Sequence, residues 1–474
     1  MPLPSDPADL FAELVRDFGA NFNRPRTFDW LHDNSVRDIA DLLEQAALRE
    51  GEIDPVRVEE LLEAVDRDED DDDDAYSRRT FAILAGLDRA LLYVNPYFGS
   101  FDQGALTPIA VRYSLTGVLN TDPTSGAVLP RCSYPGRVQH TPNTLNDAFV
   151  GVVWVPAEDW KRTDHRRLPA RNDLTRVERE GEVVIACTPF VDDANDFNWD
   201  ITERHENRFY RVSLKDGPPR RDRIAPLLME LDGSEATIAM LPELTLTPEL
   251  LAAWRSAIDD VPQPPLSNLK WLFIGTGDLG NPSPENRSVL IDRCTGEVVL
   301  EQLKIYPFTL TSEQLAEWHL DTFLGTDAIE EDLSSCDARV TVAESRLGRV
   351  AMLVCEDLAR IVDLGRALRS HGISHVFSPV FSKETLPHYW EHQKAKDYAT
   401  EAGTLVVVAN SLVVPRLMKD DGPWGTAIVH SPATTQTRST YNARDIAKFR
   451  VACGDPIPGR GDPPVDRADD ESRV

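Results

Sequence analysis

The sequence predicts an α/β fold built around a mixed β-sheet, preceded by a smaller and partly helical N-terminal region. From Glu182 onward, short apolar runs alternate with amphipathic helical patterns, which is typical of α/β domains. Before that point, apolar residues recur at helical spacing in two stretches. The composition, 41% hydrophobic and 27% charged, is that of a globular protein and allows a large buried core.

The N-terminal region divides into three predicted parts. Residues 1–66 are expected to be helical because their apolar residues repeat every three or four positions, as in Ile39, Leu42, Leu43, Ala46 and then Val58, Leu61, Leu62, Val65. The acidic run that follows repels itself and lacks the glycine and ligand spacing of a calcium loop, so we expect a solvated linker over 67–79. Residues 80–180 are expected to form an accessory α+β region with a helix over Phe81–Val94 and a strand over Phe149–Val155.

The main domain is predicted to span residues 181–452. Its buried strands are expected at 183–186, 236–240, 271–274, 349–354, 374–377 and 405–409, with a hairpin formed by 288–292 and 297–304. Helices are expected at 224–233, where apolar residues form an i, i+3, i+4, i+7 stripe, and at 359–370 and 389–402. Thr247 followed by Pro248 is typical of a helix start. The tail, 453–474, is expected to be disordered.

Charge and composition exclude several classes of function. Fifty Lys and Arg against 79 Asp and Glu leave a formal charge of −29, which opposes binding to nucleic acid or to anionic membrane surfaces. No apolar stretch is long enough to span a bilayer and the first residues lack a secretory pattern, so a cytoplasmic protein is expected. The six cysteines form no CxxC pair, so no metal site is expected.

Three residues that can carry chemistry directly follow apolar runs of the main domain. Glu243 follows ATIAMLP, Lys304 ends EVVLEQLK, and Cys355 follows GRVAMLV. A cysteine is a strong nucleophile once deprotonated, a carboxylate can take its proton, and a lysine can stabilise the negative charge that develops. Each residue alone has an ordinary structural interpretation: an inert buried thiol, a surface acid, or a lysine at a hairpin edge.

Taken together, the flanks of these residues resemble the nitrilase or carbon-nitrogen hydrolase superfamily. The matching segments are LPELTLT, NRSVLIDRCTGEVVLEQLKIYPF and GRVAMLVCEDLAR, followed by HGISHVFSPVF and WGTAIVHSP. The resemblance covers about residues 182–450 and implies an α-β-β-α sandwich of two mixed sheets. The Cys-Glu-Asp-Leu segment is most similar to the glutaminase domains of glutamine-dependent NAD synthetases, although the chain has no glycine-rich ATP-pyrophosphatase motif.

The resemblance also implies roles for individual residues. Glu243 is the expected general base, Lys304 the electrostatic stabiliser and Cys355 the nucleophile, with the backbone N–H of Glu356 in the oxyanion hole. The superfamily often has a second glutamate after the lysine, for which Glu313 is the expected residue and Glu317 the alternative. The implied function is a hydrolase that cleaves an amide or nitrile through a thioester, without a metal or organic cofactor and as a homo-oligomer.

The sequence leaves open which residues contact the substrate and which of three functions the site serves. Side chains after the nucleophile are plausible pocket walls or ordinary core, namely Phe381, Ser382, Tyr389 and Trp390. Arg360 can pair with a substrate carboxylate or with nearby acids. The same thioester would also serve a soluble acyltransferase. In a third interpretation, the site is vestigial and the N-terminal region binds a protein partner.

Overall fold

The N-terminal region is a helical unit with one small sheet. The computed structural model describes residues 2–19, 29–63, 72–96, 103–132, 145–169, 182–204, 207–275, 277, 285–320, 323, 328–333, 339–383, 385–386, 389–418, 422–431, 434–440 and 442–452. The N-terminal helices are α1 (Pro7–Gly19), α3 (Asn34–Glu50), α4 (Pro55–Glu63), α5 (Asp72–Leu91) and α6 (Thr107–Thr116). They share one apolar core with the antiparallel pair β1 (Gly126–Pro130) and β2 (Val152–Pro156).

Two boundaries differ from those expected from the sequence. Helix α5 begins at Asp72, inside the stretch 67–79 expected to be a linker, and acidic residues are favourable in the first turn of a helix. The segment after β2 forms the short helix α7 (Ala157–Trp160) and the strand β3 (Thr163–Arg167). Because β3 pairs with β13 (Val340–Ser345), one of the two large sheets of the main domain includes a strand from before residue 180.

The main domain contains two large mixed sheets. The six-stranded sheet has the order β10 (Val298–Leu303), β9 (Arg287–Asp292), β8 (Trp271–Gly275), β7 (Ile238–Leu241), β4 (Glu182–Cys187) and β19 (Ala447–Ala452). The seven-stranded sheet has the order β18 (Thr435–Thr440), β17 (Trp424–His430), β16 (Leu405–Asn410), β15 (His375–Val380), β14 (Gly348–Met352), β13 and β3. Strands β4, β7 and β8 run parallel, as do β14, β15 and β16.

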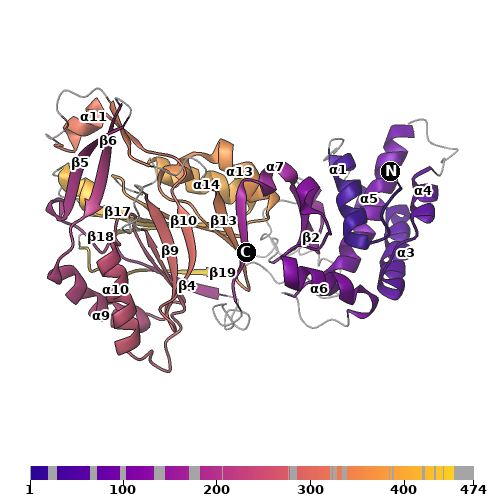
Figure 1. Ribbon diagram of the computed structural model, residues 1–474, viewed down its shortest axis with the longest axis horizontal. Coiled ribbons are helices and arrows are strands. Elements are labelled where there is room, and N and C mark those ends of the chain that lie inside the picture. Colours follow the sequence, from indigo (N-terminus) through magenta and orange to yellow (C-terminus); the bar gives the residue numbers. More distant parts are fainter. Residues whose placement is uncertain are drawn as a thin grey trace, which may run out of the picture.

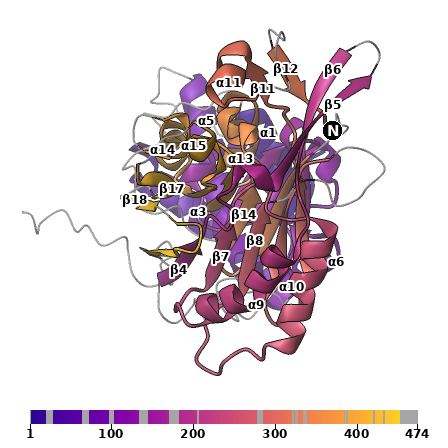
Figure 2. The same cartoon turned by 90° about the vertical axis from the view of Figure 1, so that its left-hand side faces the viewer.

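The two sheets pack face to face and helices cover their outer faces. Side chains from both sheets form the central core, in which the rings of Phe273 and Phe377 stack with centroids 4.1 Å apart. Helices α9 (Pro218–Asp232) and α10 (Pro248–Asp260) pack on the six-stranded sheet. Helices α13 (Ile361–Ser370) and α14 (Trp390–Ala402) pack on the seven-stranded sheet. The layers are therefore α-β-β-α, which confirms the expected fold class (Figures 1 and 2).

A smaller four-stranded sheet lies at the end of the sandwich remote from the N-terminal region (Figure 1). Its order is β11 (Thr309–Thr311), β12 (Ala328–Glu331), β6 (Asn207–Leu214) and β5 (Phe197–Arg204). Three further short α-helices belong to the main domain, α11 (Ser312–Glu317), α12 (Glu356–Ala359) and α15 (Val413–Leu417). In the part of the chain that the structure describes, no helix combines the length and apolar character needed to cross a bilayer.

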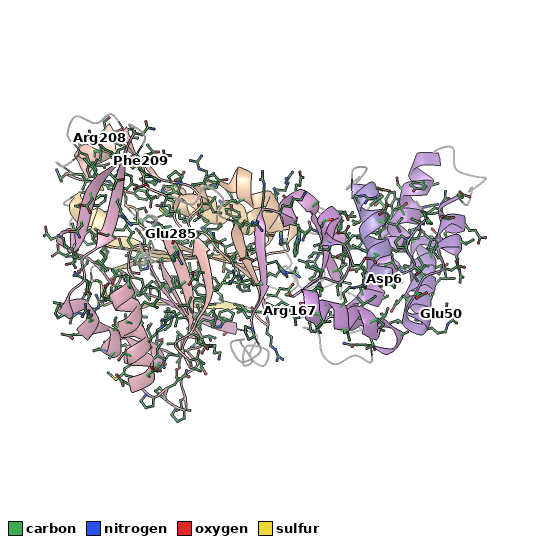
Figure 3. All side chains as sticks on the ribbon, viewed as in Figure 1. Asp6, Glu50, Arg167, Arg208, Phe209 and Glu285 are labelled. Carbon is green, nitrogen blue, oxygen red and sulfur yellow. The ribbon has the colours of Figure 1, made fainter. Side chains whose placement is uncertain are left out.

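A buried polar cluster joins the N-terminal region to the sandwich. The Glu344 carboxylate on β13 accepts hydrogen bonds from Arg349 of β14, at 2.7 Å, and from the hydroxyl of Tyr113 on α6. His165 on β3 lies 3.2 Å from the same carboxylate. At the edge of this junction, the Arg167 guanidinium stacks 4.4 Å from the centre of the Tyr113 ring. Figure 3 labels Arg167 between the sandwich and the N-terminal region.

Candidate active site

Glu243 stands on a tight turn at the end of β7. Leu244 has a positive φ of 60°, and the Thr245 hydroxyl stabilises the turn by donating to the carbonyl of Pro242 at 2.7 Å. The neighbouring strand β8 ends at Gly275, where a Cβ would lie only 2.7 Å from the Cα of Glu243. Glycine at 275 therefore lets the turn approach the end of β8 closely.

Lys304 follows β10 and its ammonium is buried between two carboxylates. Its Nζ lies 3.0 Å from Oε1 of Glu243 and 2.6 Å from Oε2 of Glu331. Burial opposes the charge on this lysine, but Glu243 and Glu331 together hold its pKa well above the usual range. The lysine is therefore a permanent cation at neutral pH.

Asn286, immediately before β9, links the two carboxylates. Its side-chain amide donates to the carboxylates of Glu243 at 2.6 Å and Glu331 at 3.0 Å. Its backbone carbonyl accepts the backbone N–H of Lys304 at 2.7 Å. Glu331 ends β12, whose register is fixed by parallel pairing with β6, and it also accepts the N–H of Phe308. An asparagine and a second glutamate thus lie beside the lysine.

Glu331, rather than Glu313, is the second glutamate at the lysine, so the expectation for Glu313 is wrong. Glu313 is exposed on α11, and the alternative, Glu317, is in an ion pair with Lys383 at 2.5 Å. The error has a physical reason: β12 returns to the lysine through strand pairing with β6, which no local periodicity in the sequence reveals.

Cys355 occupies a strained turn between β14 and α12. Its backbone has φ 49° and ψ −103°, a conformation that residues other than glycine rarely adopt. The turn is fixed because the Cys355 N–H donates to the carbonyl of Pro379 at 3.0 Å and its carbonyl accepts from Leu358 at 2.9 Å. Strain of this kind is concentrated at functional sites in proteins, where the surrounding structure maintains it.

The carboxylate of Asp357 brings the cysteine and the lysine together. It accepts backbone N–H groups from Ile305 at 3.0 Å, from Tyr306 at 2.9 Å and from Val354 at 3.2 Å. Since Ile305 follows the lysine and Val354 precedes the cysteine, one side chain fixes both backbones. Burial raises the pKa of Asp357 to about 7 even though three N–H groups favour its charged form.

The charges of Glu243 and Lys304 both affect the pKa of the Cys355 thiol. Burial and the nearby Glu243 raise its pKa well above the usual range, while Lys304 and the backbone N–H of Phe381 act in the opposite direction. Burial likewise raises the pKa of Glu243, against the opposing effect of Lys304. The structure therefore brings together the three residues expected to act as nucleophile, base and cation.

The expected substrate contacts have different surroundings. Phe381 donates its backbone N–H to Cys355, while its ring packs against Phe197 at 5.4 Å. Ser382 is buried, and its backbone N–H and carbonyl both bond the side chain of Asn410 at 3.0 Å.

The other expected contacts come from the start of α14 and from the end of α12. Tyr389 precedes α14, and Trp390 packs on the apolar cluster that contains Cys355. Arg360 pairs with Glu356 at 3.0 Å and stacks over Tyr306. Arg360 thus pairs with a nearby acid, which is one of the two interpretations that the sequence allowed for it.

Comparison with known proteins finds partial matches to solved structures. No protein-family model matches the chain, and no curated protein sequence matches it. A mutant of the Nesterenkonia AN1 amidase from the nitrilase superfamily is 14% identical, with a TM-score of 0.37, and the match covers 61% of this chain and 95% of that one.

Two further solved structures show similar values. A CN-hydrolase superfamily protein from Xanthomonas campestris is 14% identical with a TM-score of 0.34, covering 57% of this chain and 90% of that one. The Saccharomyces cerevisiae Nit3 protein, of the nitrilase superfamily, is 11% identical with a TM-score of 0.36, covering 58% and 91%.

Proposed function

We propose that this protein is a carbon-nitrogen hydrolase of the nitrilase type, which cleaves a small amide or nitrile through a thioester on Cys355. One observation carries the proposal: a cysteine on a strained turn shares a buried site with a glutamate and a lysine that are 3.0 Å apart. The sequence segments around these three residues, which resemble the carbon-nitrogen hydrolase superfamily, support the same reaction.

The pKa directions indicate how the nucleophile is activated. Because the pKa of Cys355 is raised, the resting group is a neutral thiol. We therefore expect the thiolate to form only as Glu243 takes its proton during attack on the substrate carbon. Lys304, which stays charged, stabilises the oxygen or nitrogen anion that develops, together with the N–H of Glu356 at the start of α12.

The second half of the reaction releases the product acid. In amide cleavage, the proton on Glu243 passes to the departing nitrogen, which leaves as an amine or ammonia, and Cys355 holds the acyl group as a thioester. Glu243 then takes a proton from water, the hydroxide attacks the thioester carbonyl, and the proton returns to sulfur as the acid leaves. A nitrile follows the same course after water adds to the thioimidate. Glu331 keeps the Lys304 ammonium in position, and Asn286 does the same for the Glu243 carboxylate.

The direct test is detection of the acyl-enzyme. The full chain is incubated with a library of primary amides, carbamoyl amines and nitriles, and its intact mass is followed together with release of ammonia and acid. We expect at least one compound to give an adduct that peptide mapping places on Cys355 and that C355A lacks. The matched control is C294A, which removes an exposed cysteine and should leave adduct formation unchanged.

Two results would overturn the proposal. One is the absence of both adduct and product for every member of the library, and the other is turnover that persists in C355A. Adding a panel of primary amines to the same assay distinguishes acyl transfer from hydrolysis, because a transferase would form the amide of a preferred amine faster than free acid, at a rate that saturates with the amine concentration. In that case the thioester chemistry would stand, but the hydrolase assignment would be wrong.

A further inference from the structure

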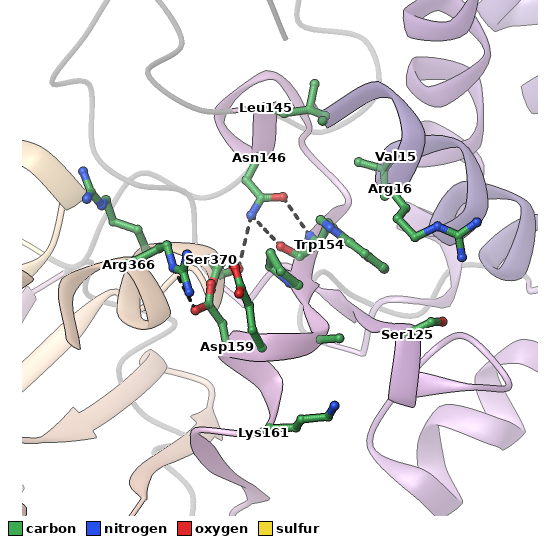
Figure 4. Close-up of a pocket in the computed structure, with 15 residues that line it drawn as sticks. Val15, Arg16, Ser125, Leu145, Asn146, Trp154, Asp159, Lys161, Arg366 and Ser370 are labelled. Carbon is green, nitrogen blue, oxygen red and sulfur yellow. Dashed lines mark hydrogen bonds and ion pairs between the residues drawn. The ribbon is translucent and has the colours of Figure 1, made fainter. Parts of the chain in front are cut away.

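The cavity where the N-terminal region meets the sandwich has its acidic and aromatic side chains already engaged. Its volume is about 790 Å³, and residues of α1, β2, α7 and α13 line it (Figure 4). Its two acids, Glu158 and Asp159, both pair with Arg366, at 2.9 and 3.1 Å. The Trp154 ring packs on Gly126, where a Cβ would lie 1.9 Å from the indole. Strand β6, by contrast, carries a hydroxyl with no hydrogen-bond partner in the described part of the chain.

Tyr210 on β6 is held beside the candidate active site by strand pairing. It is the in-register neighbour of Glu331 in the parallel pair of β6 and β12, and its carbonyl accepts the N–H of Asp332 at 2.8 Å. Paired residues project their side chains to the same face of a sheet, so Tyr210 lies next to the glutamate that binds Lys304. The small four-stranded sheet therefore adds a side chain to the site (Figure 2).

The Tyr210 ring is buried and fixed, but its hydroxyl is unused. The residue is 4% exposed, and its ring centre lies 6.4 Å from that of Trp199 and 6.5 Å from that of Phe323. Within the residues that the structure describes, the hydroxyl makes no hydrogen bond, yet it is not one of the fully enclosed polar atoms that lack a partner. It therefore borders space that water or a small molecule can reach.

The charges around this hydroxyl place it on the lysine side of the site. Burial raises the pKa of Tyr210 well above the usual range, Glu331 raises it further, and Lys304 opposes this rise. Glu243 and Cys355 raise the same pKa by smaller amounts. The phenol therefore keeps its proton at neutral pH, and it interacts more strongly with the carboxylate and ammonium around the lysine than with the thiol.

The neighbouring carboxylates do not use the proton of this hydroxyl. Glu243 and Glu331 each accept hydrogen bonds from Lys304 and from Asn286. A hydroxyl can donate one hydrogen bond, and a buried donor is costly while it has no acceptor. In the proposed reaction, an acceptor arrives as the substrate atom that becomes negative beside the lysine.

We propose that Tyr210 is a further catalytic residue, whose hydroxyl donates to the substrate atom that becomes negative when Cys355 attacks. In that step the sulfur-carbon bond forms, Glu243 takes the thiol proton, and an electron pair moves from the C=O or C≡N bond onto oxygen or nitrogen. Lys304, the Glu356 N–H and the Tyr210 hydroxyl donate to that atom, and Tyr210 keeps its proton. The inference rests on the proposed function and adds to it a donor from outside the sandwich.

The test uses an aldehyde, which adds to a thiol as an amide does but has no leaving group. Acetaldehyde labelled with ¹³C at its carbonyl should form a thiohemiacetal on Cys355 of the full chain, seen by NMR as a signal that C355A lacks. The thiol proton ends on the former carbonyl oxygen, which accepts from Tyr210. We expect the dissociation constant of this adduct to rise at least tenfold in Y210F. The matched control is Y76F, which alters a tyrosine that is 49% exposed on α5 and should leave the constant unchanged.

Urea unfolding separates this catalytic role from a structural one. Because the hydroxyl has no partner in the described protein, Y210F should be as stable as the unchanged protein or more stable. Equal affinity of Y210F for the aldehyde, or a loss of stability in Y210F, would overturn the inference and leave the proposed function standing. If the unchanged protein forms no thiohemiacetal, both the proposed function and this inference are overturned.

Discussion

Replacing Glu344 by glutamine tests the buried junction between the N-terminal region and the sandwich. Burial alone would raise the pKa of this carboxyl, but Arg349 and His165 lower it from 4.5 to about 2. A shift of that size corresponds to about 3 kcal/mol of folding stability. Removing one partner of a buried ion pair typically costs ~3–5 kcal/mol, which agrees. We therefore expect E344Q to lower the free energy of unfolding by about 3 kcal/mol at pH 7.

The sign of the pH dependence follows from the lowered pKa. The stabilisation is fully present above the unfolded-state value of 4.5 and is lost as the pH falls towards 2. The difference between the unchanged protein and E344Q should therefore shrink to about 1 kcal/mol at pH 3. Urea unfolding of both proteins at pH 7 and pH 3 measures it.

The control is E301Q, whose carboxylate is exposed and pairs with Arg287, and it should cost less than about 0.5 kcal/mol. A cost below about 1 kcal/mol for E344Q at pH 7, or the same cost at both pH values, would refute the reasoning.

Two further predictions concern the candidate active site, and a third concerns the packing of the Trp154 ring against Gly126. Because burial raises the pKa of Glu243, we expect the acid limb of kcat/KM to lie above pH 4.5, and a limb at or below 4.5 would contradict this. E331Q should lower kcat at least tenfold while E313Q, on exposed α11, leaves it unchanged, and steady-state kinetics showing equal effects would remove Glu331 from the site. G126A should displace the Trp154 ring and cost about 1–3 kcal/mol in urea unfolding, and no loss of stability would show that the ring moves freely.

The sequence predicts those parts of the fold in which local pattern and burial agree. Strands β7 and β8 are short, wholly apolar runs, β16 is apolar up to its last residue, Asn410, and all three lie where the sequence places them. Strand β3 was missed because its sequence, TDHRR, is polar, and its partner β13 is far away in the chain. Strands β5 and β6 were missed because they are only partly buried and carry many charged residues.

The candidate active site shows the same division. Glu243, Lys304 and Cys355 lie within three residues of the ends of β7, β10 and β14, so strand ends and family resemblance were sufficient to select them. Asn286 and Glu331 act through contacts with residues distant in sequence, and only the pairing of strands brings them to the site. For Asp357, the position two residues after the cysteine was the one available signal.

Strand β3 has a consequence for anyone who wishes to isolate the hydrolase-like part of the chain. A fragment that starts at residue 182 would lack it, and β13 would become the border of the seven-stranded sheet with its outward backbone amides and carbonyls uncovered. Borders of that kind recruit other chains and cause aggregation. The useful cut therefore lies before Thr163, and the N-terminal portion is better regarded as part of the sandwich than as a removable appendage.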